Sequence, residues 1–176
     1  RLLWTISQKI NLQLISFDGG GLRNAIPRES CCVIAISESD QSMFETIVNS
    51  MVDTFKTEYK SIEEHLRVEC NEIQSVGDAV SSAEGIKIIN TLCAVHNGVY
   101  RMSPDIKGLV ETSSSLARVE IKGGLFITQS LQRSSVDSTR DEVAMTIKSC
   151  FENMGCEVIQ SGEYPGWQPN PDSRIL

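Results

Sequence analysis

Hydrophobic and polar positions change their spacing several times in the first part of the chain. Residues 2–10 carry leucine and isoleucine at helical spacing and predict a short opening helix. Residues 12–17 predict a strand, and the nearly continuous apolar run 31–37 predicts a strand covered on both faces. In residues 43–55 apolar side chains recur every four positions, which indicates the clearest helix of the chain. Apolar and polar residues then alternate in 66–71, which predicts a half-buried strand.

The same order of patterns recurs in the second half. Residues 122–124, Lys-Gly-Gly, are typical of a tight reversal between strands. The predicted elements around it are, in order, strands 108–113, 116–121 and 125–132, a helix over 139–155 and a strand over 156–160. Because strands, helix and strand recur about a hundred residues apart, we expect two pseudo-repeated strand-strand-helix-strand units. The predicted fold class is α+β, a twisted antiparallel sheet with helices packed on one face.

Helix boundaries are indicated by capping residues. Gly155 is the expected stop of the last helix, and a helix between the two units should end at Asn97-Gly98. Three Ser/Thr residues precede a glutamate with capping-box spacing: Ser42 and Glu45, Ser81 and Glu84, Thr139 and Glu142. These pairs predict where three helices begin.

A run of three glycines, 19–21, precedes Asn24 and Pro27 in "FDGGGLRNAIPRES". Glycine accepts positive φ and allows close approach of another backbone, so the run predicts a forced turn. A dinucleotide-binding loop would need a third glycine at the place of Asn24 and a helix directly after it. The pattern therefore favours a hairpin loop between two strands over a phosphate-binding loop.

Charge and composition exclude several function classes. The 176 residues suffice for one domain, or for two small halves that share a core. The net charge is −7 with the basic residues scattered singly, which argues against a nucleic-acid surface. No apolar run approaches the length of a membrane helix, and no leader pattern precedes the first predicted helix. We therefore expect a protein without nucleic-acid or membrane partners.

Cysteine and histidine usage points to a reducing compartment and to no zinc site within this chain. None of the six cysteines forms a C-x-x-C pair, so buried free thiols in a cytoplasmic protein are expected. Only two histidines are present, His65 and His96, and neither has metal-ligand spacing to another ligand. A thiol enzyme using Cys31 or Cys32 is a further hypothesis, although neither has a neighbouring base in the sequence.

Three polar residues are candidates for substrate binding. Asn24 could aim its amide at developing negative charge, and the alternative is an asparagine that closes a turn. Arg133, in "SLQRSSVDS", ends a predicted strand and could bind a carboxylate with two parallel hydrogen bonds. Its alternative is a solvated charge that pairs with Asp137. Asn97 is the third candidate, with a helix stop as its alternative.

Several motifs together resemble one known family. The segments "LISFDGGGLRNAIPRES", "NGVYRMSPDIKGLVETSSSLARV", "SLQRSSVDS" and "GEYPGWQPNPDS" are similar to the inserted domain of Xaa-His dipeptidases. These aminoacyl-histidine or beta-alanyl-histidine (carnosine) dipeptidases are members of the di-zinc aminoacylase and carboxypeptidase superfamily. The resemblance covers essentially the whole chain, and "LRNAIPRE" together with "YPGWQP" is its most specific part.

The resemblance implies a lid and dimerisation domain, residues 1–164, inserted between two parts of a catalytic domain, with residues 165–176 as the linker back. It implies two zinc ions bound by the absent catalytic domain, a dipeptide substrate, a homodimer and a cytoplasmic location. Asn24 then matches a residue near the substrate oxyanion, and Arg133 matches one that binds the terminal carboxylate. The lid's other oxyanion role falls on Asn97 or His96, and the resemblance alone leaves that choice open.

The competing hypothesis is a non-catalytic module whose task is self-association. Both hypotheses predict a soluble fragment and allow it to be a dimer, and the lid hypothesis predicts that the fragment folds but hydrolyses nothing. They differ in geometry, because a substrate lid requires Asn24 and Arg133 on one open face of the domain. A scaffold would allow them to point to opposite sides.

Overall fold

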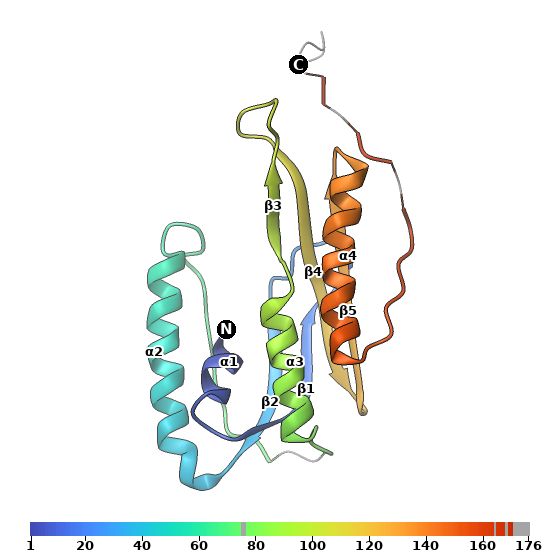
Figure 1. The fold of residues 1–176 in the computed structure, drawn as a ribbon. Coiled ribbons are helices and arrows are strands. Elements are labelled where there is room, and N and C mark those ends of the chain that lie inside the picture. Colours follow the sequence, from blue (N-terminus) through green and yellow to red (C-terminus); the bar gives the residue numbers. More distant parts are fainter. Residues whose placement is uncertain (75–76, 164, 168, 171–176) are drawn as a thin grey trace. The chain divides into compact units, whose positions relative to one another are not determined.

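The structure is a computed structural model that describes residues 1–74, 77–163, 165–167 and 169–170 of the chain. Within this part, helices and strands both occur in each half of the sequence (Figure 1). The elements are α1 (Leu2–Ser7), β1 (Leu12–Gly20), β2 (Ser30–Ile36), the 3-10 helix η1 (Glu38–Asp40), α2 (Gln41–Tyr59), α3 (Ser82–Ala94), β3 (Gly98–Met102), β4 (Val110–Lys122), β5 (Leu125–Ser134) and α4 (Asp137–Met154).

The strands form a five-stranded sheet with the order β2-β1-β4-β3, and β5 pairs with β4. β3 runs antiparallel to β4, with Gly98 opposite Ser114 and Met102 opposite Val110. The register shifts on both sides of Arg101, which is typical of β-bulges. The predicted α+β class with an antiparallel sheet is thereby confirmed.

Two predicted strands are absent from the structure. Residues 66–71 and 156–160 alternate as expected but pair with no strand. Cys156 and Val158 explain the second pattern, because both pack against the buried core of α4 without joining the sheet. Alternation reports one buried side of an extended segment, whereas a strand also needs a neighbour with free backbone groups.

Two further strand predictions need correction. The segments predicted as strands 108–113 and 116–121 overlap with one continuous strand, β4, which begins at Val110. The intervening serines do not break it, because Ser114 is buried and accepts a hydrogen bond from Gln132 Nε2 at 3.3 Å. β3 was not predicted, because a strand of five residues is too short to show a clear periodic pattern of apolar side chains.

The predicted helix starts are right once and wrong twice. Ser81 caps α3 as expected, because its Oγ accepts a hydrogen bond from the Glu84 amide at 3.3 Å. α2 begins at Gln41, so Ser42 lies inside the helix and bonds through its carbonyl to Thr46. Thr139 also lies inside its helix, since α4 begins at Asp137. The predicted stop of α4 is confirmed, because Gly155 has the left-handed φ of 94°.

The chain divides into two compact units. The first comprises residues 1–17, 32–93 and 122–124. In this unit α3 approaches β1 closely, because a Cβ at Gly85 would lie 3.7 Å from the Leu14 side chain. Arg1 joins α1 to α2 through two hydrogen bonds to Glu58, of 2.6 and 3.0 Å. Buried apolar side chains complete the core of this unit: Ile6, Ile10, Leu12, Leu14, Val48, Ile88 and Ile89.

The second unit comprises residues 18–31, 94–121 and the described residues from 125 onward. Its helix α4 lies along β4 and β5 (Figure 1) and buries one face against them. The Phe126 and Phe151 rings lie 6.4 Å apart in this core. The buried cluster is Val95, Val143, Ile147 and Phe151, and Tyr100, Leu116, Phe126, Cys150, Cys156 and Val158 pack around it.

The segment after α4 is attached to the start of that helix. The Gly166 amide donates a hydrogen bond to Asp137 Oδ1 at 2.8 Å. A Cβ at Gly166 would lie 2.9 Å from the Ser135 carbonyl carbon and 3.0 Å from the Ser134 oxygen. Only glycine therefore fits at this contact. The predicted linker 165–176 includes this glycine, and residues 168 and 171–176 lie outside the described residues.

We expect Gly166→Ala to release this segment, because the added Cβ overlaps backbone atoms of Ser135. Amide hydrogen exchange at position 166 should accelerate by about tenfold or more once the bond to Asp137 is lost. Gly21→Ala is the matched control, since nothing lies within 4 Å of its added Cβ. Unchanged exchange at position 166 in Gly166→Ala would contradict the close contact.

None of the helices in the described part of the chain combines the length and the apolar character that crossing a membrane requires.

Candidate functional site

Arg133 lies on the face of β5 that points away from α4. Phe126 and Ser134 both face the helix, because Phe126 packs in its core and Ser134 Oγ lies 2.9 Å from Thr139 Oγ1. Side chains alternate along a strand, so Arg133 projects from the opposite face. The exposure pattern of β5 agrees, since Arg133 is exposed between two half-buried neighbours.

The guanidinium of Arg133 has no recorded hydrogen bond or ion pair to any residue in the described ranges. The predicted pairing with Asp137 is wrong. Asp137 instead accepts hydrogen bonds from Arg140 Nη1 at 3.0 Å and from the Gly166 amide at 2.8 Å. The N–H groups of the Arg133 guanidinium are therefore open to solvent. They can donate two parallel hydrogen bonds to a planar anion such as a carboxylate.

A buried polar network begins at Ser134, the residue that follows Arg133, and no sequence pattern predicted it. It joins Glu111 and Thr112 of β4, Ser134 of β5 and Thr139 of α4 through hydrogen bonds between 2.8 and 3.4 Å. Arg101 of β3 forms an ion pair with Glu111, with Nε and Oε1 3.3 Å apart. The polar run 111–115 was the available signal, but no local pattern shows which of its members face the interior.

Asn24 lies in the exposed loop between β1 and β2. The loop is a hairpin connection, as predicted, since the Gly20 amide donates to the Glu29 carbonyl at 3.1 Å. A tight turn places Asn24 at its tip, with the Ala25 amide bonded to the Leu22 carbonyl at 3.0 Å. Within the described residues no hydrogen bond of the Asn24 side chain is recorded, so its amide is open to solvent.

Arg118 holds the start of this loop. Its Nη1 donates to Asp18 and to the Gly20 carbonyl, and its Nη2 lies 3.3 Å from Glu120 Oε1. The hydrogen bond to Asp18 raises the pKa of Arg118 above its ordinary value. No local sequence pattern predicts this cluster, because Asp18 and Arg118 are a hundred positions apart.

Asn97 has a structural contact that its candidate role must accommodate. Its Oδ1 accepts a hydrogen bond from the Leu116 backbone amide at 2.9 Å. Since Asn97 directly precedes β3, its side chain extends the pairing of β3 with β4 by one bond. The oxygen is thereby occupied, and only the Nδ2 group remains to donate to a ligand.

His96 is a poor donor to solvent in this conformation. Its Nε2 is buried and has no hydrogen-bond partner among the described residues. The ring instead stands edge-on to Tyr100 with 5.2 Å between centroids. Tyr100 is in turn anchored to α4, because its hydroxyl donates to Glu142 Oε1 at 3.2 Å.

The three predicted site residues all belong to the second unit, and all are exposed. No direct contact between any two of Asn24, Asn97 and Arg133 is recorded in the described part of the chain. A ligand that touched all three would therefore have to span the distances between them. Their roles stay predictions on this geometry.

The six cysteines are free thiols, as predicted, but they are not uniformly buried. Cys31, Cys70 and Cys93 are exposed, which corrects the expectation of a buried set. The error arises because apolar neighbours in sequence do not place a side chain in the interior. Burial raises the pKa of the Cys156 thiol, which makes that cysteine a weaker nucleophile.

Across the described residues, no group of three or more His, Cys, Asp or Glu side chains is placed to hold a metal ion. The donor set of these described residues therefore does not fit a zinc centre. A zinc centre in the same protein would need ligands from other residues.

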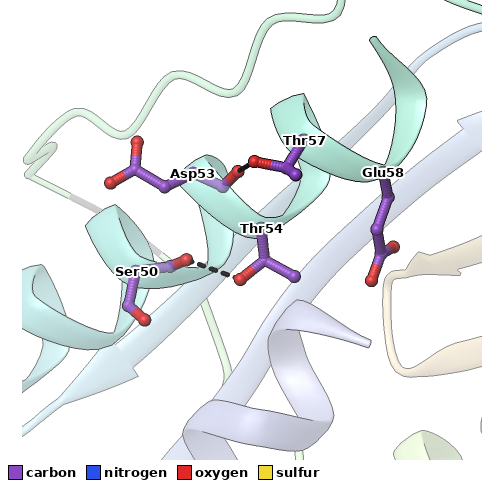
Figure 2. Close-up of a pocket in the computed structure, with 5 residues that line it drawn as sticks. All are labelled: Ser50, Asp53, Thr54, Thr57 and Glu58. Atoms are coloured by element: carbon purple, nitrogen blue, oxygen red, sulfur yellow. Dashed lines mark hydrogen bonds between the residues drawn. The ribbon is translucent and has the colours of Figure 1, made fainter. Parts of the chain in front are cut away.

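A hollow on α2 is lined by Ser50, Asp53, Thr54, Thr57 and Glu58 (Figure 2). Its hydroxyl groups are directed back to the helix, because Thr54 and Thr57 each donate to the carbonyl four residues earlier at 2.9 Å. Glu58 is bound to Arg1. This hollow contains none of the predicted site residues and no activated nucleophile.

Comparison with known proteins finds relatives that cover the chain. Cytosol non-specific dipeptidase of Escherichia coli (strain K12) is 32% identical over all 176 residues, which span 36% of its length. The crystal structure of aminoacylhistidine dipeptidase from Vibrio alginolyticus matches with a TM-score of 0.91 at 33% identity, covering 99% of this chain and 36% of that one. No family model matches the sequence.

Proposed function

Because this chain is homologous to a partial domain of dipeptidases, we propose that it covers the substrate in a zinc-dependent aminoacyl-histidine dipeptidase. The full-length protein would hydrolyse the peptide bond of Xaa-His dipeptides in the cytoplasm. The zinc ions, two in number, would be held by the catalytic domain, whose residues lie outside this chain.

The state of Arg133 is the observation that supports this proposal most directly. An exposed arginine that has no partner among the described residues, at the end of a strand and on the face opposite α4, is suited to bind an anion. A dipeptide carries one terminal carboxylate, and a guanidinium binds a carboxylate with two parallel hydrogen bonds. We therefore assign Arg133 to the substrate's C-terminal carboxylate.

Asn24 and Asn97 complete the proposed set of substrate contacts. An amide NH2 group that points at the scissile carbonyl oxygen stabilises the negative charge that develops there. Asn24 is assigned to this position because its amide is exposed at the tip of a loop that Arg118 anchors. Asn97 contributes through Nδ2, since its oxygen is bound to Leu116.

We assign residues 1–164 to the lid and dimerisation domain and residues 165–176 to the linker that leads back to the catalytic domain. The tether between Gly166 and Asp137 supports a defined start of that linker, because it holds the chain at the β5–α4 turn. A homodimer formed through this domain is part of the same proposal.

The proposal is tested by assaying the full-length protein and this chain in parallel with an Xaa-His dipeptide and zinc. We expect hydrolysis by the full-length protein, and none by the chain alone, because its described residues contain no metal cluster. Turnover by the purified chain would overturn the division of labour. Failure of the full-length protein to cleave any dipeptide would overturn the assignment to dipeptidases.

A further inference from the structure

Three hydroxyl groups meet behind Arg133, one from each of three elements. Thr112 Oγ1 of β4 lies 2.8 Å from Ser134 Oγ of β5 and 2.9 Å from Thr139 Oγ1 of α4. Ser134 Oγ and Thr139 Oγ1 are also 2.9 Å apart. Thr112 is fully buried and Thr139 nearly so, which shields the cluster from water.

Counting protons gives one direction of these hydrogen bonds that satisfies every donor, and Thr139 Oγ1 has the Val136 carbonyl at 3.0 Å as a second acceptor. Each hydroxyl has one hydrogen to donate, and a carboxylate can only accept. Glu111 Oε1 lies 3.2 Å from Thr139 Oγ1, so the chain of donors can end there. Its other end is the Val136 amide, which donates to Ser134 Oγ at 3.0 Å. The run from Val136 through Ser134, Thr112 and Thr139 to Glu111 is thereby fully satisfied.

Glu111 carries the charge on which this run terminates. Its side chain is only 5% exposed, and a buried carboxylate without partners is strongly unfavourable. Arg101 supplies the opposite charge through Nε at 3.3 Å. The main chain of Glu111 contributes as well, because its carbonyl accepts from the Ser135 amide at 3.1 Å.

These contacts all act on the turn that directly follows Arg133. The Ser134 hydroxyl, the Ser135 amide and the Val136 amide are each bound, and all three bonds lead to Glu111 or to its hydroxyl chain. α4 has no side-chain cap at Val136, but the network supplies the acceptor for the Val136 amide, which precedes the helix.

From this geometry we propose that Glu111 is a positioning residue for Arg133. It acts through the hydroxyls of Thr112, Ser134 and Thr139, which hold the end of β5 and therefore the backbone from which the guanidinium projects. This inference rests on the proposed function of Arg133 in binding the substrate carboxylate. A displaced arginine would bind that carboxylate less well without changing the steps that follow binding.

The test uses two isosteric changes in the full-length protein. Thr139→Val removes the hydroxyl but keeps the shape, and Glu111→Gln removes the charge. For an Xaa-His dipeptide we expect each to raise KM by about fivefold with kcat within about twofold of wild type. Thr139→Ser restores the hydroxyl and should return KM to near its wild-type value.

Thr146→Val is the matched control on the same helix. Among the described residues its hydroxyl donates only to the Glu142 carbonyl, at 3.0 Å and within α4, so its removal should leave KM unchanged. Amide hydrogen exchange of Ser135 and Val136 gives a readout besides activity. It should accelerate in Thr139→Val and in Glu111→Gln, but not in Thr146→Val.

The double variants separate this inference from the proposed function. If Glu111 acts through Arg133, Glu111→Gln should raise KM no further in the Arg133→Ala background. A full additional increase in that background would overturn the positioning role while leaving the carboxylate contact in place. An unchanged KM in Arg133→Ala alone would overturn the carboxylate contact, and the positioning role with it.

Discussion

Replacing Arg133 by alanine in the full-length protein is expected to raise KM for a dipeptide roughly 30-fold, with little change in kcat. A charge-assisted hydrogen-bonded pair contributes about 2 kcal/mol, and 1.4 kcal/mol corresponds to a factor of ten. The terminal carboxylate is charged in both the ground state and the transition state. Its loss of binding should therefore appear in KM rather than in kcat.

Two features of the structure make this effect large. The Arg133 side chain is exposed on the face opposite α4, so a ligand can reach it. No residue in the described ranges competes for its guanidinium, because Asp137 is bound by Arg140 and Gly166. Arg133→Lys should recover only part of the affinity, since an ammonium group lacks the planar fork.

Arg67→Ala is the control for a general loss of positive charge. Arg67 is also exposed, and it belongs to the first unit, whereas the proposed contact residues belong to the second. We expect its KM and kcat to match the wild type. A wild-type KM in Arg133→Ala would assign Arg133 to the solvated surface and would favour the self-association module.

Replacing Gly20 by alanine should destabilise the fold by about 4 kcal/mol, and should lower the melting temperature by roughly 10 °C. The φ of Gly20 is 73°, a left-handed conformation that costs other residues about 1–2 kcal/mol. The added Cβ would also lie 2.0 Å from the Ala117 carbonyl oxygen. That contact cannot be relieved by a side-chain rotation, because both partners are held in strands.

Gly21→Ala provides a matched comparison one position away. Nothing lies within 4 Å of its added Cβ, and its φ is not in the left-handed region, so we expect a change within about 0.5 kcal/mol. Urea unfolding of both variants measures the difference directly. Equal stability of the two would show that Gly20 does not require its close approach to Ala117.

Gly20 and Gly21 illustrate which structural features the sequence can predict and which it cannot. A run of glycines before Asn24 predicted a hairpin loop, and the structure has one there. Which glycine of the run is indispensable does not follow from the run itself. Gly20 is constrained by Ala117, nearly a hundred residues later in the chain, and only the paired strands bring the two together.

The contacts of charged residues in the candidate site could not be predicted from the local sequence either. Arg133 was predicted from its place at the end of a strand, but its expected partner Asp137 is bound elsewhere. Glu111 and Thr112 lie in a polar run that looks solvent-exposed, yet both are buried. A bulge in the pairing of β3 with β4 turns both side chains toward α4, and sequence spacing does not reveal a bulge.

Local patterns in the chain were sufficient to predict its long helices, most of its strands and its α+β class. These features depend on which side chains must avoid water. The local patterns were also sufficient for the motifs that led to dipeptidases. Only the tertiary structure shows how the strands pair, that the Glu111 network is buried, and that the Arg133 side chain is exposed to solvent. Each depends on contacts between distant residues, and such contacts leave no periodic trace in the order of the amino acids.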